Sequence, residues 1–184
     1  MSITVSINGH PMNVSEKSSV LDAINASGTY ISQLCKDPDM KPIGACRTCL
    51  VEIEGARGFP ASCSVPVADG MKVRTDTMDV KNLRSGVIEL TLSMFPEHST
   101  NATKDYRELS IAAKKHDLGH SRWTGRSREP VDSSNPIFNI SMDSCIMCGR
   151  CASACQDGAQ FIGAIDILGS STSARIGTFM DKPL

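Results

Sequence analysis

The chain has 184 residues, a net charge of −1 at neutral pH and only 4% aromatic residues. A near-neutral charge argues against a general binder of nucleic acids or of anionic membrane surfaces. No segment reaches the roughly 18–20 apolar residues that a membrane-spanning helix needs, so we expect no direct membrane insertion. The N-terminus shows no basic region followed by an apolar run, as a secretory signal would. We therefore expect a cytoplasmic protein with one or two small, mainly aliphatic domains.

Residues 1–77 carry the signals of a small α+β domain. Apolar and polar residues alternate on both sides of Asn8-Gly9, which predicts a β-hairpin with a tight turn. Ser19 stands three positions before Asp22, a spacing that resembles a capping box at the start of a helix. The predicted strands and helix of this domain lie at residues 3–7, 12–14, 20–28, 50–53 and around 73.

Four of the eight cysteines lie in this first domain, with the spacing Cys35-x10-Cys46-x2-Cys49-x13-Cys63. A [2Fe–2S] cluster needs four thiolates, and a loop with two close cysteines plus two others brought in by the fold suits it. Backbone N–H groups of the loop and the nearby Arg47 are expected to raise the reduction potential of the cluster. The alternative is a structural zinc site, but such sites usually pair two Cys-x2-Cys knuckles, and this group has one.

From residue 78 the apolar residues recur at steps of three and four, which predicts an amphipathic helix. A second helix is expected at residues 104–115. Residues 120–136 are rich in Arg, Ser and Pro and are interpreted as a linker, with a short strand at residues 137–140 after it. The predicted buried face of the first of these helices consists of Val80, Leu83, Val87, Leu90 and Met94.

The strongest motif is the second cysteine group, Cys145-x2-Cys148-x2-Cys151-x3-Cys155. Three cysteines at steps of three suit one face of a [4Fe–4S] cluster. In two-cluster ferredoxins the fourth cysteine of such a run serves the other cluster, so Cys155 serves either the same cluster or a second one. The chain ends at Leu184 without another cysteine. We expect a domain cut short by truncation, with a free-standing subunit completed by Cys155 or a partner residue as the alternative.

The hairpin, the helix, the stretch Cys-x10-Cys-Arg-Thr-Cys-Leu-Val-Glu-Ile and the second cysteine group together resemble one oxidoreductase family. It includes the large iron–sulfur subunit of respiratory complex I, the alpha subunit of NAD-linked formate dehydrogenases and related hydrogenase subunits. The resemblance implies an α+β fold: a β-grasp [2Fe–2S] ferredoxin-like domain at 1–77, a helical segment and linker at 78–136, and a partial bacterial-ferredoxin-like [4Fe–4S] domain at 137–184. The ligands that it implies are Cys35, Cys46, Cys49 and Cys63 for [2Fe–2S], and Cys145, Cys148 and Cys151 for [4Fe–4S].

The middle segment departs from the family pattern. Many relatives carry His-x3-Cys-x2-Cys-x5-Cys there, which binds a further [4Fe–4S] cluster, whereas His98 of this chain is followed by no cysteine before Cys145. A single histidine does not hold such a cluster, so we expect that this cluster is lost and that His98 binds no metal. His116 and His120 are expected to be solvated surface residues, and His10, after the hairpin turn, indicates no function.

The leading functional hypothesis is an electron-transfer module of an NAD(P)-linked oxidoreductase. By resemblance, electrons would pass between a molybdenum or tungsten pterin catalytic domain and a flavin/NAD subunit, and formate dehydrogenase is preferred over complex I or a hydrogenase. No dinucleotide fingerprint or phosphate loop is present, so we assign no catalytic residue and expect the chain alone to perform no substrate chemistry. The alternatives are a succinate dehydrogenase-type iron–sulfur subunit, a zinc-stabilised scaffold protein and a disulfide-bonded secreted domain.

Overall fold

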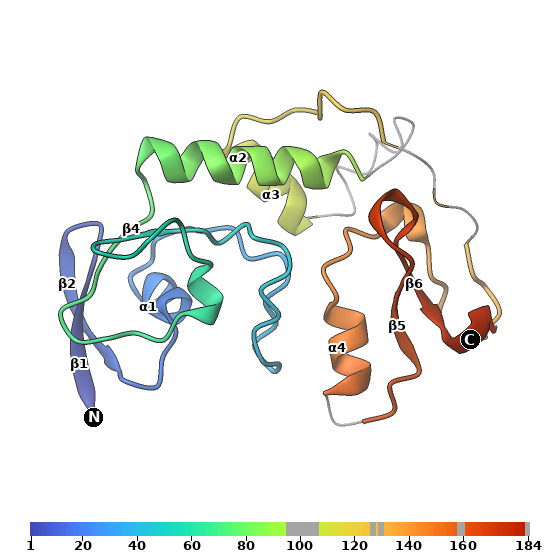
Figure 1. Cartoon of the computed structure of the whole chain (residues 1–184), viewed down its shortest axis with the longest axis horizontal. Helices are drawn as coiled ribbons and strands as arrows, with labels where there is room; N and C mark the ends of the chain where they lie inside the picture. The colour runs from blue at the N-terminus through green and yellow to red at the C-terminus, as the bar shows by residue number, and fades with distance from the viewer. Residues whose placement is uncertain (95–106, 126–127, 129–130, 158–160, 183–184) are drawn as a thin grey trace.

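The computed structural model of the chain describes residues 1–94, 107–125, 128, 131–157 and 161–182. Figure 1 shows the N-terminal domain at one end and the C-terminal elements at the other, with two helices lying above and between them. The strands and α-helices are β1 (Ser2–Ile7), β2 (His10–Ser15), α1 (Val20–Ala26), β3 (Glu52–Ile53), β4 (Lys72–Arg74), α2 (Met78–Leu92), α3 (Arg107–Lys115), α4 (Arg150–Gln156), β5 (Ile165–Leu168) and β6 (Arg175–Thr178).

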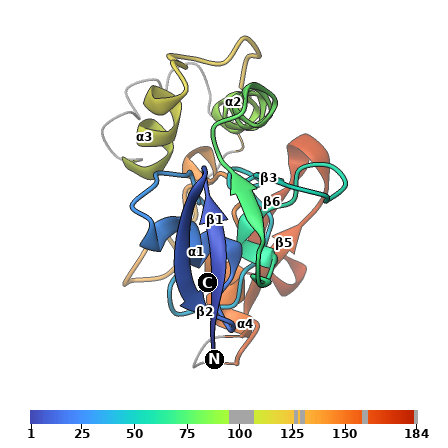
Figure 2. The same ribbon diagram turned by 90° about the vertical axis from the view of Figure 1, so that its left-hand side faces the viewer.

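The N-terminal domain is a four-stranded sheet with the order β2-β1-β4-β3. The hairpin β1–β2 is antiparallel and β1–β4 is parallel, so β4 returns to the sheet beside the first strand. Asn8 and Gly9 both have positive φ, which is the conformation that a tight two-residue hairpin turn requires. The predicted hairpin is therefore confirmed, and α1 packs across the sheet as expected (Figure 2).

The start of α1 is fixed by a reciprocal cap, as the sequence predicts. The Asp22 backbone N–H donates to Ser19 Oγ at 3.2 Å, and the Ser19 backbone N–H donates to Asp22 Oδ2 at 2.9 Å. Two helix-end donors are thereby satisfied, which stabilises the helix start. The helix then buries its apolar side in the main core of the domain, which contains Val5, Ile7, Val20, Leu21, Ile24, Val51, Ile53 and Val73.

The second core lies between α2, α3 and the loop that follows α1. α2 begins at Met78 as predicted, but the predicted buried face is only partly correct: Val80 is fully buried, whereas Leu83 and Leu90 are 42% and 55% exposed. The buried line instead runs from Val80 to Arg84 and Ile88 at steps of four, on a neighbouring side of the helix. Ile88 packs there against α3 and the loop, which decides the orientation of α2.

In the C-terminal part, one predicted strand is missing from the described structure and two strands are present that were not predicted. The strand expected at residues 137–140 is absent from the described structure, in which only a single bridge joins Asp132 to Ile140. Ile137 is 89% exposed, so it has no sheet face to cover. β5 and β6 form an antiparallel hairpin beyond α4 that the sequence did not indicate (Figure 1). Among the described helices none is long and apolar enough to span a membrane.

The orientation of α2 generates a stability prediction. We expect Ile88→Ala to lower the free energy of unfolding by about 2–5 kcal/mol, because it leaves a cavity at a fully buried position. Leu90→Ala, on the exposed side of the same helix, should change it by no more than about 0.5 kcal/mol. Urea unfolding followed by circular dichroism measures both. Equal losses from the two substitutions would show that α2 is rotated toward the face predicted from the sequence.

Candidate iron–sulfur sites

The four cysteines of the first group converge in the structure as two thiol pairs. Cys35 lies in the loop after α1, Cys46 and Cys49 lie in the loop before β3, and Cys63 lies in the 3-10 turn Ser62–Ser64. The side chains of Cys35 and Cys46 are in hydrogen-bonding contact, and so are those of Cys49 and Cys63. All but the half-buried Cys46 are buried.

Hydrogen bonds around the first group hold the loops that carry the thiols. The Cys46 backbone N–H donates to Cys35 Sγ at 3.5 Å, a bond of the kind expected to tune a cluster. The Ser62 hydroxyl and the Ser62 backbone N–H both donate to the Cys49 carbonyl, at 2.8 and 3.0 Å. Because Ser62 precedes Cys63, these bonds fix the distance between the Cys49 loop and the Cys63 turn.

Within each pair, the two thiols differ in pKa. A hydrogen bond from Cys35 lowers the pKa of Cys46 to about 5, and one from Cys49 lowers the pKa of Cys63 to about 6. The same contacts, together with burial, raise the pKa values of Cys35 and Cys49. Each pair therefore presents one thiol that ionises readily, and the thiolate is the form that ligates metal.

The pairwise arrangement bears on the choice between a cluster and zinc. Each iron of a [2Fe–2S] rhomb takes two thiolates and shares two sulfides, whereas structural zinc takes four ligands at one point. Two thiol pairs therefore fit the two-iron cluster.

The second group is carried by a loop and by α4. Cys145 and Cys148 lie in the loop, while Cys151 and Cys155 lie one turn apart on α4. Burial raises the pKa of Cys151, and the charges of Cys145 and Cys148 raise it further. Cys155 Sγ accepts a hydrogen bond from the backbone N–H of Ala164 at 3.1 Å.

Both cysteine loops contain a residue in the left-handed conformation between their two close cysteines. A non-glycine residue with positive φ lies between the cysteines of each Cys-x2-Cys: Arg47 in the first loop and Met147 in the second. The left-handed conformation turns the Met147 backbone N–H toward Cys145 Sγ, at 3.3 Å. Gly149 also has positive φ, directly before α4. Arg128 anchors the second loop, because its side chain donates to the Cys145 carbonyl.

The two cysteine loops lie side by side and share an apolar contact. Leu34, which precedes Cys35, is buried in the second core, and Cys46 packs against the same core. Ile146, which follows Cys145, packs against that core from the other loop. Gly149 approaches Ile43 closely, since a Cβ placed at Gly149 would lie 3.8 Å from Ile43 Cγ2. The second core therefore touches both cysteine loops, while Cys49 and Cys63 of the first group lie in the main core of the N-terminal domain.

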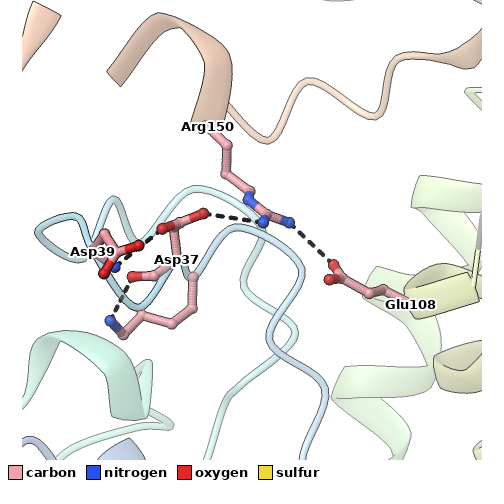
Figure 3. A network of polar contacts seen from close by, with 5 residues as sticks. Asp37, Asp39, Glu108 and Arg150 are labelled. Atoms are coloured by element: carbon pink, nitrogen blue, oxygen red, sulfur yellow. Dashed lines mark hydrogen bonds and ion pairs between the residues drawn. The ribbon is translucent and has the colours of Figure 1, made fainter. Parts of the chain in front are cut away.

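An ionic bridge links the same two loops at the surface (Figure 3). Arg150, between Cys148 and Cys151, donates to Asp37 Oδ2 at 3.1 Å and to Glu108 Oε2 of α3 at 3.2 Å. Asp37 stands two residues after Cys35, and its pKa is lowered first by the Asp39 backbone N–H and then by Arg150. The sequence analysis missed this bridge, because the two partners are 113 positions apart.

The histidines play a minor part in the described structure. His120 is exposed, as expected, and so is His10. His116 is half-buried and shares a 2.9 Å hydrogen bond with the Ser85 hydroxyl, so it is not the solvated surface residue that the sequence suggested. Burial lowers its pKa. His98 lies outside the described residues, and its lack of a metal role stays a prediction.

Comparisons with known proteins assign these sites to a family. Residues 1–78 match a 2Fe-2S iron-sulfur cluster binding domain, and residues 138–161 match a 4Fe-4S binding domain. A mitochondrial NADH dehydrogenase [ubiquinone] iron-sulfur protein 1 from Solanum tuberosum is 32% identical over 98% of this chain. The chain belongs to the iron–sulfur family that the large subunit of complex I shares with formate dehydrogenase-like proteins.

Two further relatives extend this family toward hydrogenases. Subunit HndD of an NADP-reducing hydrogenase from Solidesulfovibrio fructosivorans is 35% identical over 83% of this chain. A chain in the crystal structure of an NAD+-reducing [NiFe]-hydrogenase in the H2-reduced state superposes with a TM-score of 0.84 at 25% identity, covering 97% of this chain and 75% of that one. This chain spans about a quarter of the two sequence relatives, 24% and 27% of their lengths.

The family membership confirms the fold class and both cofactors. The chain is α+β, with a [2Fe–2S] ferredoxin-like domain followed by a [4Fe–4S] motif. It is an iron–sulfur electron-transfer module of the NADH-type oxidoreductase and hydrogenase family. Both clusters move single electrons, and the thiol pairs of the first group fit the first cluster.

Serine substitutions test which thiols bind which cluster. We expect Cys49→Ser to abolish the [2Fe–2S] EPR signal and to destabilise the N-terminal domain, because Cys49 is buried in its core. The [4Fe–4S] signal should persist. Cys148→Ser is the matched variant and should give the reverse result. A [2Fe–2S] signal that survives Cys49→Ser would remove Cys49 from the ligand set.

Proposed function

We propose that the chain relays electrons between a flavin subunit that handles NAD(P) and a catalytic domain, with both clusters held by its own cysteines. In this proposal Cys145, Cys148 and Cys151 hold the [4Fe–4S] cluster. The two thiol pairs, Cys35 with Cys46 and Cys49 with Cys63, hold one iron each of the [2Fe–2S] cluster. When bound, the clusters supply one-electron chemistry at iron. We expect the work to be done in the cytoplasm, where thiols stay reduced.

The observation that carries the proposal is the shared core beneath the two cysteine loops. Leu34 and Cys46 from one loop and Ile146 from the other pack against the same residues of α2 and α3. Electron tunnelling falls steeply with distance, so two clusters must be held close to exchange electrons quickly. A dry, close-packed contact holds such a distance constant better than a hydrated surface does. The packing therefore supports direct transfer between the two clusters.

The first candidate for the catalytic partner is a formate-oxidising domain with a molybdenum or tungsten pterin. Its support is the family resemblance together with the loss of the His/Cys motif after Cys63. The second candidate is a hydrogenase or a complex I-type NADH dehydrogenase. The names of the relatives and the 0.84 superposition on a chain of an NAD+-reducing hydrogenase favour it. In either case the chain would work through partner subunits.

An iron count tests whether the chain holds both clusters unaided. After anaerobic reconstitution we expect about six irons and about six acid-labile sulfides per chain, the sum of a [2Fe–2S] and a [4Fe–4S] cluster. EPR of the dithionite-reduced protein should show both signals. Cys155→Ser decides the fourth ligand, because a loss of about four irons relative to the unaltered chain would assign Cys155 to the same cluster as Cys145, Cys148 and Cys151. About two irons in the unaltered chain would mean that the [4Fe–4S] cluster needs residues from elsewhere.

The catalytic partner is identified by purifying the tagged chain from its native cells. A formate dehydrogenase-type complex should contain molybdenum or tungsten, and should reduce viologen dye with formate and NAD(P)+ with the same donor. Nickel with hydrogen-dependent dye reduction would favour a hydrogenase instead. A purified complex that holds a flavin but reacts only with NADH would point to the complex I type. Recovery of the loaded chain without any flavoprotein would contradict the proposed relay.

A further inference from the structure

A polar pocket lies where the N-terminal domain meets the helical pair α2 and α3. It has a volume of about 410 Å³ and is lined by residues 29–32, by α2 and by the end of α3. Asn8 and Thr75 form part of its wall and are joined by two hydrogen bonds, of 2.8 and 2.7 Å. Among the residues that the structure describes, no cysteine lines it. The pocket therefore has the size of a small-molecule site and is separate from both cysteine groups.

Arg84 places a permanent positive charge in the wall of this pocket. Its side chain is only 5% exposed, and a guanidinium remains protonated even when buried. Arg84 Nη2 donates to the Thr75 carbonyl, but its Nε is buried without a hydrogen-bond partner. Within the described residues no carboxylate forms an ion pair with Arg84. A buried charge is costly unless an opposite charge compensates it, and an anion in the pocket would supply that charge.

Further hydrogen-bond donors reach the same pocket from both helices. Lys81 of α2 and Lys115 of α3 line it, and Lys115 Nζ lies 5.5 Å from the centre of the Tyr30 ring. His116 Nδ1 is 2.9 Å from the Ser85 hydroxyl, and burial lowers the pKa of His116, so its ring is neutral at pH 7. When Nδ1 accepts from Ser85, Nε2 carries the proton and can donate it to a ligand.

Two carboxylates also line the pocket, and they do not neutralise it. Asp76 and Asp117 are exposed, so water screens their charges. Neither forms an ion pair with a cation in the part of the chain that the structure describes. The buried charge is the cation, and a charge in a low-dielectric wall acts more strongly on a ligand than a solvated one does. The pocket therefore favours an anion over a cation.

We propose that this pocket binds a phosphate group, with Arg84 as its buried counter-charge and Lys115 and His116 as further donors. A phosphate group carries about −1.5 to −2 charge at pH 7 and three strong acceptor oxygens. It can thus accept from several sides, as a wall built from α2, α3 and residues 29–32 requires. The Ser32 hydroxyl, 3% exposed and without a hydrogen-bond partner, is a second unsatisfied polar group on this wall. The proposal is independent of the cluster ligands.

The test is isothermal titration calorimetry of the reconstituted full chain with inorganic phosphate, at an ionic strength held constant with chloride. We expect one site per chain. Lys115→Met should weaken binding about tenfold, the loss expected for one charge-assisted hydrogen bond. Lys114→Met is the matched control, because it removes the same charge from the next residue, which is exposed and does not line the pocket. It should change the affinity less than about twofold. No saturable binding, or equal losses in the two variants, would overturn the proposal.

A second pair of variants tests the buried charge. Arg84→Met should abolish phosphate binding, and Arg84→Lys should retain it. Phosphate should raise the thermal midpoint of the unaltered chain but not that of Arg84→Met, because only a chain that binds the ligand is stabilised by it. If Arg84 served only to hold Thr75, Arg84→Met would bind phosphate as well as the unaltered chain, and the counter-charge would be refuted. If Arg84→Met fails to fold, the two lysine variants decide.

Two further probes distinguish the source of the phosphate group. Binding of AMP tenfold more tightly than inorganic phosphate, with the gain lost in Tyr30→Ala, would identify the phosphate of a larger molecule packed on the exposed Tyr30 ring. Equal or weaker binding of AMP would identify free phosphate. Either result supports the site. Acetate binding as tightly as phosphate, with the same loss in Lys115→Met, would instead indicate a carboxylate ligand, such as an acidic partner segment, and would overturn the assignment to phosphate.

Discussion

The contact on which the structure depends is the packing of α2 and α3 onto the loop that leads into Cys35. Leu34 enters a core with Ile88, Leu109 and Ala112, and the second cysteine loop reaches the same core through Ile146. The first cysteine loop, the helical pair and the second cysteine loop therefore share one core. Among the described residues, the Arg150 ion pairs, the Gly149–Ile43 contact and the Arg128 bond to the Met94 carbonyl also join the two regions.

The thiol loops themselves are held in a backbone conformation that has a cost without metal. Arg47 and Met147 both adopt positive φ, which is unfavourable for residues with a Cβ atom. Hydrogen bonds and packing from the surrounding loops offset this cost, and cluster binding offsets it further, because metal binding contributes to folding. The two loops share this conformation although they belong to different domains. In each, a turn between the two cysteines directs backbone N–H groups toward sulfur.

Local signals were predictable from the sequence, and contacts between distant segments were not. The Asn8-Gly9 turn, the Ser19 cap and the cysteine spacings each involve residues close in sequence, and the structure or the comparisons confirm what they indicated. Leu83 and Leu90 were predicted on the buried face of α2 because they are apolar and recur at helical spacing. The tertiary contacts instead bury the line of Val80, Arg84 and Ile88. The β5–β6 hairpin was not predicted, although its strands are longer than β3 and β4, which were.

The surface bridge through Arg150 differs in kind from the core beneath it. Arg150 is about one-third exposed, at 35%, so dissolved ions reach the Asp37 and Glu108 contacts and weaken them. The apolar core is not screened in this way. The two halves are thus joined by an ionic contact that salt weakens and by an apolar contact that salt does not screen. At high ionic strength we therefore expect the apolar core to contribute most of what holds the two cysteine loops together.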